Sequence, residues 1–192
     1  MANKIKFGLK NVYYAKATIA TDGSATYTTP VSFPGAVSLS LSPQGDTSNF
    51  YADNVVYWVG VSNQGYEGDL EIARVSDDFK KDILGYIVDG GGALVENVNA
   101  PAQHFALMFQ FEGDEKATRH VMYNCVAQRP DTAGSTKEES VDPQTESVSI
   151  TATSIFSSAL NTDIVKAEMA EATNTPYTTW FTSVYSVTAA TP

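Results

Sequence analysis

The chain has 192 residues, 22 of them acidic and 12 basic, and its formal net charge is −10. This acidic balance argues against a protein that grips nucleic acid, because such binding rests largely on Lys and Arg at phosphates. A single cysteine excludes an intrachain disulfide, and the longest apolar run is far below the ~20 residues needed to cross a bilayer. With no signal peptide at its N-terminus, we expect a protein made in a cytoplasm and not inserted into a membrane.

The composition predicts a single, mainly β domain over residues 1–192. Tyrosine and phenylalanine are plentiful, with 10 and 9 copies, and valine and threonine recur throughout. Aromatic and β-branched side chains suit a pleated, half-buried surface, and the apolar content of 43% is sufficient for one core.

The first half of the chain reads as strands joined by turns. Residues 10–20 predict a strand that turns back at Asp22-Gly23. Residues 36–42 alternate, with Val37, Leu39 and Leu41 on one face and Ser38, Ser40 and Ser42 on the other. Residues 43–53 mix turn formers with aromatics and predict a long loop. Residues 54–62 then predict an apolar strand that turns directly into the strand at 66–73.

The strand at 66–73 carries the most informative pattern. Successive strand side chains point to opposite faces, so Glu67, Asp69 and Glu71 form one acidic row, while Leu70 and Ile72 face a core. The outward side chains at Ser38 and Ser40, and at Ser147, Ser149 and Thr151 of a predicted strand over 144–153, form two further polar rows. These rows belong either to an ordinary solvated sheet face or to a smooth, negatively charged wall.

One helix is predicted after residue 76, and a second near the C-terminus. Ser76 is a good N-cap, Gly85 can end the helix, and Phe79 and Ile83 lie on one face. Strands follow at 103–111 and 119–127, a loop at 129–143, and a weakly patterned segment at 154–175. Thr175-Pro176 can start a short helix with an apolar side at Trp180, Phe181, Val184 and Tyr185, and we expect 186–192 to be a flexible tail.

The sequence gives little support for catalysis or metal binding. Cys125 could be a nucleophile with His104 or His120 as its base, but its place inside an apolar strand favours a small core residue. The two histidines have no zinc-site spacing, and Gly90–Gly92 lacks the lysine of a phosphate-binding loop. We therefore expect no enzyme, no metal and no cofactor.

Seven stretches in order resemble one family, the major tail (tail tube) proteins of long, non-contractile phage tails, of the type found in phages and prophages of Gram-positive hosts. They are Lys6–Ala15, Pro34–Trp58, Asn63–Ala73, Asp77–Gly85, Phe105–Cys125, Gln144–Thr153 and Trp180–Tyr185. The resemblance is loose at 86–102, 129–143 and 154–175.

The resemblance implies a β-sandwich or barrel-like subunit with a flanking helix and a short C-terminal helix. Six copies would close into a ring, rings would stack into a tube, and the inner sheets would line a channel, or lumen. The lumen-facing candidates are then Ser38, Ser40, Glu67, Asp69, Glu71, Ser147, Ser149 and Thr151. The loop at 43–53 would bridge subunits or rings through Pro43, Asp46, Phe50, Tyr51 and Asp53. Alternatively, Phe50 and Tyr51 fold back on their own core.

The family also implies a location and partners. The protein would reside in the virion, in the phage tail, and contact itself, a tape-measure protein, and tail terminator and distal tail proteins. Genomic DNA would pass through without specific binding. If six subunits each give four inner strands, the barrel measures about 48 Å across its backbones, wider than a DNA duplex.

The rival interpretation is a monomeric β-sandwich binding module for adhesion or carbohydrate, with Tyr51, Tyr57, Trp58 and Tyr66 stacking on sugars.

Overall fold

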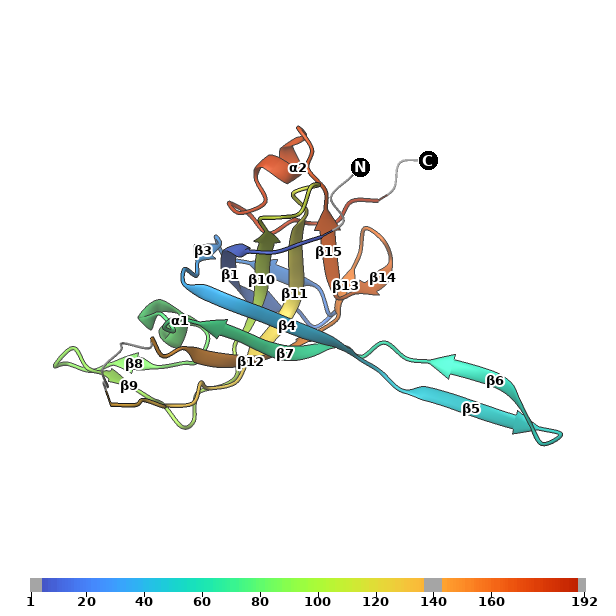
Figure 1. Cartoon of the computed structure of the whole chain (residues 1–192), viewed down its shortest axis with the longest axis horizontal. Helices are drawn as coiled ribbons and strands as arrows, with labels where there is room; N and C mark the ends of the chain where they lie inside the picture. Colours follow the sequence, from blue (N-terminus) through green and yellow to red (C-terminus); the bar gives the residue numbers. More distant parts are fainter. Residues whose placement is uncertain (1–4, 137–142, 190–192) are drawn as a thin grey trace.

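The computed structural model describes residues 5–136 and 143–189, and its main feature is one large antiparallel sheet (Figure 1). The strand order is β2-β1-β10-β11-β12-β7-β4, with β3 added beside β1 and β15 beside β11. The elements are β1 Leu9–Ile19, β2 Ala25–Tyr27, β3 Val31–Ser32, β4 Ala36–Gln44, β5 Thr47–Ala52, β6 Val55–Val61, β7 Gly65–Ile72, α1 Asp77–Asp82, β8 Ile87–Val88, β9 Leu94–Val95, β10 His104–Phe111, β11 Arg119–Ala127, β12 Glu146–Thr153, β13 Ile155–Ser157, β14 Thr162–Ile164, β15 Lys166–Met169 and α2 Thr175–Thr178. The prediction of a mainly β, sandwich-like fold with two short helices is confirmed.

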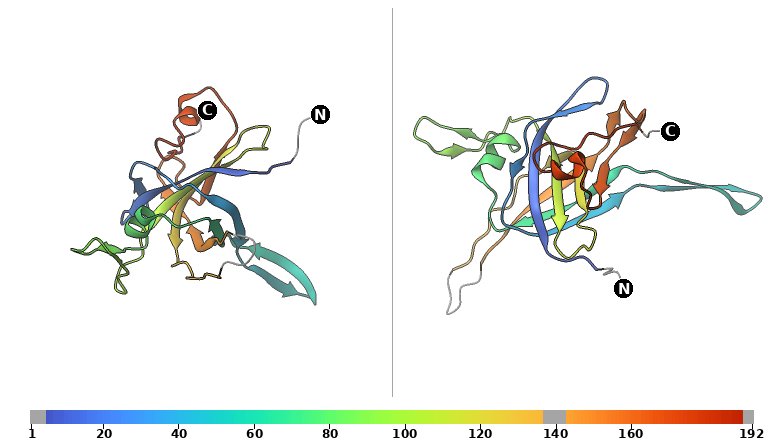
Figure 2. Two further views of the ribbon diagram at one scale, coloured as in Figure 1. Left: turned by 60° about the vertical axis from the view of Figure 1, so that its left-hand side comes forward. Right: turned by 90° about the horizontal axis from the view of Figure 1, so that it is seen from above.

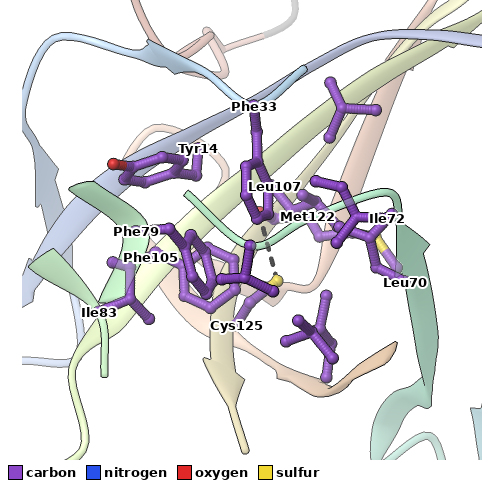
Figure 3. Close-up of a cluster of buried hydrophobic side chains, with 14 of the residues drawn as sticks. Tyr14, Phe33, Leu70, Ile72, Phe79, Ile83, Phe105, Leu107, Met122 and Cys125 are labelled. Carbon is purple, nitrogen blue, oxygen red and sulfur yellow. Dashed lines mark hydrogen bonds between the residues drawn. The ribbon is translucent and has the colours of Figure 1, made fainter. Parts of the chain in front are cut away.

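The central strands β10 and β11 are buried on both faces, so the sheet separates two cores. In the first core, the ring of Phe79 of α1 stacks on that of Phe33, with ring centroids 4.5 Å apart (Figure 3). It also makes an edge-on contact with Phe105, with ring centroids 5.6 Å apart. Leu70 and Ile72 of β7 enter the same core. The inward side of β4, β7 and β12 is therefore fixed by apolar packing.

The second core lies on the opposite face and is covered by the C-terminal part of the chain. Trp180 is fully buried there, beside Met108 and Tyr123. The guanidinium of Arg119 lies 4.0 Å from the ring centroid of Tyr177 and 4.9 Å from that of Phe181. These contacts hold α2 and the following turn against β11. The prediction that Trp180, Phe181, Val184 and Tyr185 form the apolar side of the helix is wrong, because α2 ends at Thr178 and these four residues follow it.

Local signals predict the start of α1 correctly and its end closely. Ser76 accepts a hydrogen bond from the amide of Phe79 at 3.2 Å, as expected of an N-cap. The helix ends at Asp82, slightly before Gly85. Gly85 has a positive φ of 71°, and this conformation directs the chain away from the helix. In β4, Val37 is 53% exposed, because the pairing with β7 shifts register between Ala36 and Ser38. The prediction that Val37 lies on the same face as Leu39 and Leu41 is therefore wrong.

Residues 43–53 do not form a long loop. Residues 43 and 44 end β4, and 47–52 form β5, which pairs with β6. The prediction that the strand at 54–62 turns directly into 66–73 is also wrong, since β6 pairs with β5. Residues 45–64 form a two-stranded arm that extends from the end of β4 and β7 away from the rest of the molecule (Figures 1 and 2).

The weakly patterned segment at 154–175 contains three short strands that the sequence did not predict. One of them, β15, pairs with the first half of β11, and β12 pairs with the second half. Residues 129–136 and 143 lack regular structure, as predicted, and 137–142 lie outside the described residues. Of the expected flexible tail, residues 186–189 are described, and they form no helix or strand.

Candidate assembly surfaces: an acidic sheet face and an exposed arm

The predicted polar rows lie side by side on one face of three neighbouring strands. In register, Glu71 pairs with Ser38 of β4 and Ser147 of β12, and Asp69 pairs with Ser40 and Ser149. The next row places Glu67 between Ser42 and Thr151. We call these nine outward side chains the acidic face. It brings together all eight lumen-facing candidates.

Hydrogen bonds hold two of the three carboxylates of this face against the sheet. Glu71 accepts from the hydroxyls of Thr145 at 2.7 Å and Ser38 at 2.9 Å, and these bonds lower the pKa of its carboxyl. Asp69 accepts from the hydroxyl of Ser149 at 2.6 Å. These hydroxyls therefore donate hydrogen bonds to Glu71 and Asp69 without adding a positive charge to the face.

The acidic face carries no positive charge of its own, since β4, β7 and β12 contain no Lys, Arg or His. Two contributors were not among the candidates. Ser42 continues the alternation of β4 and could have been chosen from it. Thr145 precedes β12, and only the pairing of β12 with β7 brings it to Glu71.

The five candidates from the expected loop are distributed along the arm and its base. Pro43 lies in β4 opposite Tyr66, Asp46 lies at the base of the arm, and Phe50 and Tyr51 lie in β5. Asp53 lies in the turn at the tip, where it and Asn54 have φ angles of 51° and 65°. Two consecutive positive φ values are typical of the type I′ hairpin turn, whose twist matches paired strands.

The arm exposes large apolar side chains to solvent. Phe50 is 59% exposed and Tyr51 62% exposed, so the alternative in which they fold back on their own core is wrong. The other large exposed apolar side chains of the arm are Val55, Val56, Tyr57, Trp58, Val59 and Val61. A two-stranded hairpin with this many exposed apolar side chains, whose strands pair with no third strand in the described part of the chain, is typical of an interaction surface.

The residues considered for catalysis have structural roles. Cys125 is fully buried and its Sγ lies 3.9 Å from the carbonyl oxygen of Met122 (Figure 3). Burial raises the pKa of its thiol to about 12, which opposes formation of the nucleophilic thiolate. His104 hydrogen-bonds Asn124 at 2.7 Å, and His120 stacks on Phe109 with ring centroids 5.0 Å apart. Cys125 is thus the core residue that its strand context favoured.

The aromatic residues proposed for sugar stacking do not form one platform. Tyr51, Tyr57 and Trp58 lie on the arm, whereas Tyr66 lies in the body beneath Lys166, whose Nζ is 5.4 Å from the ring centroid. Across residues 5–136 and 143–189, no group of three or more His, Cys, Asp or Glu side chains is arranged to hold a metal ion. In the same part of the chain, no helix has both the length and the apolar character to span a membrane.

Comparison with protein families decides the class of the molecule. A family model described as phage tail tube protein matches residues 2–188. The chain belongs to the phage tail tube protein family. Comparison with curated proteins found no match. As a tail tube protein, it is a structural component of the phage tail that self-assembles and contacts other tail components. The family resemblance is confirmed, and the Gram-positive host stays a prediction.

Proposed function

We propose that this tail tube protein forms hexameric rings that stack into a tube, with the acidic face lining the channel through which DNA leaves the virion. The observation that carries the proposal is the in-register acidic face, exposed on its outer side and fixed to a core on the other. A channel rich in lysine would retain DNA, because each phosphate contact adds affinity. Carboxylates and hydroxyls instead let the duplex slide.

The arm supplies contacts between copies. Its apolar side chains are exposed to water in the single chain. Burying them between copies removes apolar surface from water, which stabilises the assembly by roughly 25 cal/mol per Å². At the two ends of the tube we propose contacts with tail terminator and distal tail proteins. Inside it, during assembly, we propose a tape-measure protein. Synthesis in the host cytoplasm precedes this assembly.

Charge reversal on the acidic face tests the channel assignment. The variant Glu67→Lys/Asp69→Lys/Glu71→Lys is introduced into a phage that lacks its own copy of the gene, and DNA release is followed by dye fluorescence. We expect intact tails and ejection at least tenfold slower than wild type, with partial recovery at high salt because salt screens phosphate contacts.

The neutral variant Glu67→Gln/Asp69→Asn/Glu71→Gln is the matched control. It keeps the size of each side chain and adds no positive charge, so its ejection rate should lie much closer to wild type. Intact lysine-bearing tails that eject at the wild-type rate would place the acidic face outside the channel.

A further inference from the structure

The body of the molecule carries a groove on the inward side of β4 and β7. It has a volume of about 390 Å³ and lies between the inward side of β4 and β7 and the strands β11 and β15. Its apolar and aromatic lining includes Leu39, Leu41, Tyr66, Phe109, Phe111 and His120. This volume is sufficient to receive large side chains from another molecule.

The groove carries a net positive charge, although the protein as a whole is acidic. Lys6 and Lys166 line it, with the Nζ of Lys6 lying 4.7 Å from the ring centroid of Phe111. Glu168 also lines it and lies 3.6 Å from His120 and 4.0 Å from Lys166. Among the described residues, no carboxylate forms an ion pair with Lys6, so the groove has more cationic than anionic charge.

Two strand edges border this groove. Within the described part of the chain, β4 pairs with β7 on one side only, and β15 pairs with β11 on one side only. An unpaired edge offers backbone N–H and C=O groups to a further strand. The groove therefore provides both side-chain and main-chain contacts for an extended segment.

The arm has the complementary properties. Its only charged residues are Asp46 and Asp53, and Phe50 lies directly opposite Trp58 on one face. A Cβ at Gly60 would lie 2.2 Å from the ring of Trp58, so the indole of Trp58 lies over Gly60. Within the described residues, each strand of the arm also pairs on one side only. The arm of one molecule points away from the body and so cannot fill the groove of the same molecule (Figures 1 and 2).

We propose that this groove receives the arm of a second copy of the chain. Phe50 and Trp58 enter the apolar part, and the negative charge of the arm faces the positive charge of Lys6 and Lys166. The contact joins two different surfaces, so it repeats from copy to copy and builds a closed ring or a stack. This inference rests on the proposed assembly into a tube and identifies the surface that the arm contacts.

A charge-reversal cycle on the purified full-length protein tests the pairing. The arm variant is Asp46→Lys/Asp53→Lys, the groove variant is Lys6→Glu/Lys166→Glu, and a third chain carries both. We expect each single-surface variant to raise the concentration needed for assembly at least tenfold, measured by light scattering and negative-stain microscopy. The combined variant should return to within about threefold of wild type, because attraction between the two surfaces is restored.

The control Lys80→Glu/Lys81→Glu makes the same change in net charge as the groove variant, but on α1, and should assemble as wild type. If the arm variant fails while the groove variant assembles normally, or if the combined variant is not rescued, the groove does not receive the arm. The proposal of a tube would then stand. If wild-type protein forms neither rings nor tubes, the tube proposal fails and this inference with it.

A cross-link provides an independent readout. In the variant Asp53→Cys/Lys166→Cys, oxidation should give a ladder of covalent oligomers on a non-reducing gel, while Asp53→Cys alone should give at most dimers. The native Cys125 is buried and does not interfere. Absence of the ladder in assembled wild-type-like tubes would overturn the pairing.

Discussion

At the scale of single residues, the acidic face combines a row of like charges with hydrogen bonds from neighbouring hydroxyls. Glu71 accepts hydroxyl hydrogen bonds from Thr145 and Ser38, on the two sides of its strand. These donors stabilise the charged form, which lowers the pKa of Glu71. The Glu71 carboxylate, held in this way, stays ionised and lies close to the sheet, which suits a smooth wall.

Removing both donors should raise the pKa of the Glu71 carboxyl toward its ordinary value. The variant Ser38→Ala/Thr145→Val keeps the strands and deletes the two hydroxyls, and an NMR titration of the Glu71 carboxyl carbon measures the change. In the wild type, the lowered pKa contributes stability above the unfolded-state pKa that is lost as pH falls through the folded-state pKa. The variant should lack this acid-dependent contribution.

The control for this titration is Ser149→Ala, which deletes the hydroxyl that donates to Asp69. It should leave the Glu71 titration unchanged. A Glu71 pKa that does not move in the double variant would show that the two hydroxyls do not stabilise its charge.

At the scale of elements, the sequence predicts what local chemistry determines. The alternation of β7 and β12 is correct because one face of each strand is buried, and the start of α1 is correct because Ser76 caps it locally. The eight lumen-facing candidates follow from the same alternation. Their hydrogen bonds do not, since these depend on register between segments 33 to 80 residues apart.

The missed elements are those whose order comes from distant partners. The strand β5 packs on no core of its own chain, so its sequence has no alternation of buried and exposed side chains to identify it. The strand β15 is four residues long and is defined by its pairing with β11, more than 40 positions earlier. Such short strands carry too little local pattern to be distinguished from loops.

The pairing of β4 with β7 depends on a close approach at Gly68. A Cβ at this position would lie 1.8 Å from the carbonyl oxygen of Ser40, a backbone atom that cannot move without moving β4. We expect Gly68→Ala to lower the free energy of unfolding by about 1–3 kcal/mol, as for other overpacking changes. Chemical denaturation with circular dichroism measures this loss.

The matched control is Gly90→Ala, in a position where a Cβ would meet nothing within 4 Å. Its effect should stay within about 0.5 kcal/mol, as at other surface positions. Equal stability of the two alanine variants would mean that β4 moves away from β7 without cost.

At the scale of the whole molecule, the body and the arm have different sources of stability. Two apolar clusters on either side of β10 and β11 hold the body together. The arm contributes none of its side chains to either cluster, although hydrogen bonds at its base, such as Ser62 N–H to the Asp46 carbonyl at 3.0 Å, continue the β4–β7 ladder. Folding and assembly should therefore be separable by altering the arm alone.

Replacement of residues 45–64 by Asn-Gly is the direct test. Gln44 and Gly65 are a paired position in the β4–β7 ladder, so a two-residue type I′ turn can join them without changing the register. We expect a monomer whose body unfolds with a midpoint within a few degrees of wild type, because no core side chain is lost. We also expect no tubes by negative-stain microscopy at concentrations where wild type assembles. Tubes from the armless chain would assign ring and tube contacts to the body alone, whereas loss of the folded body would show that the arm stabilises its own chain.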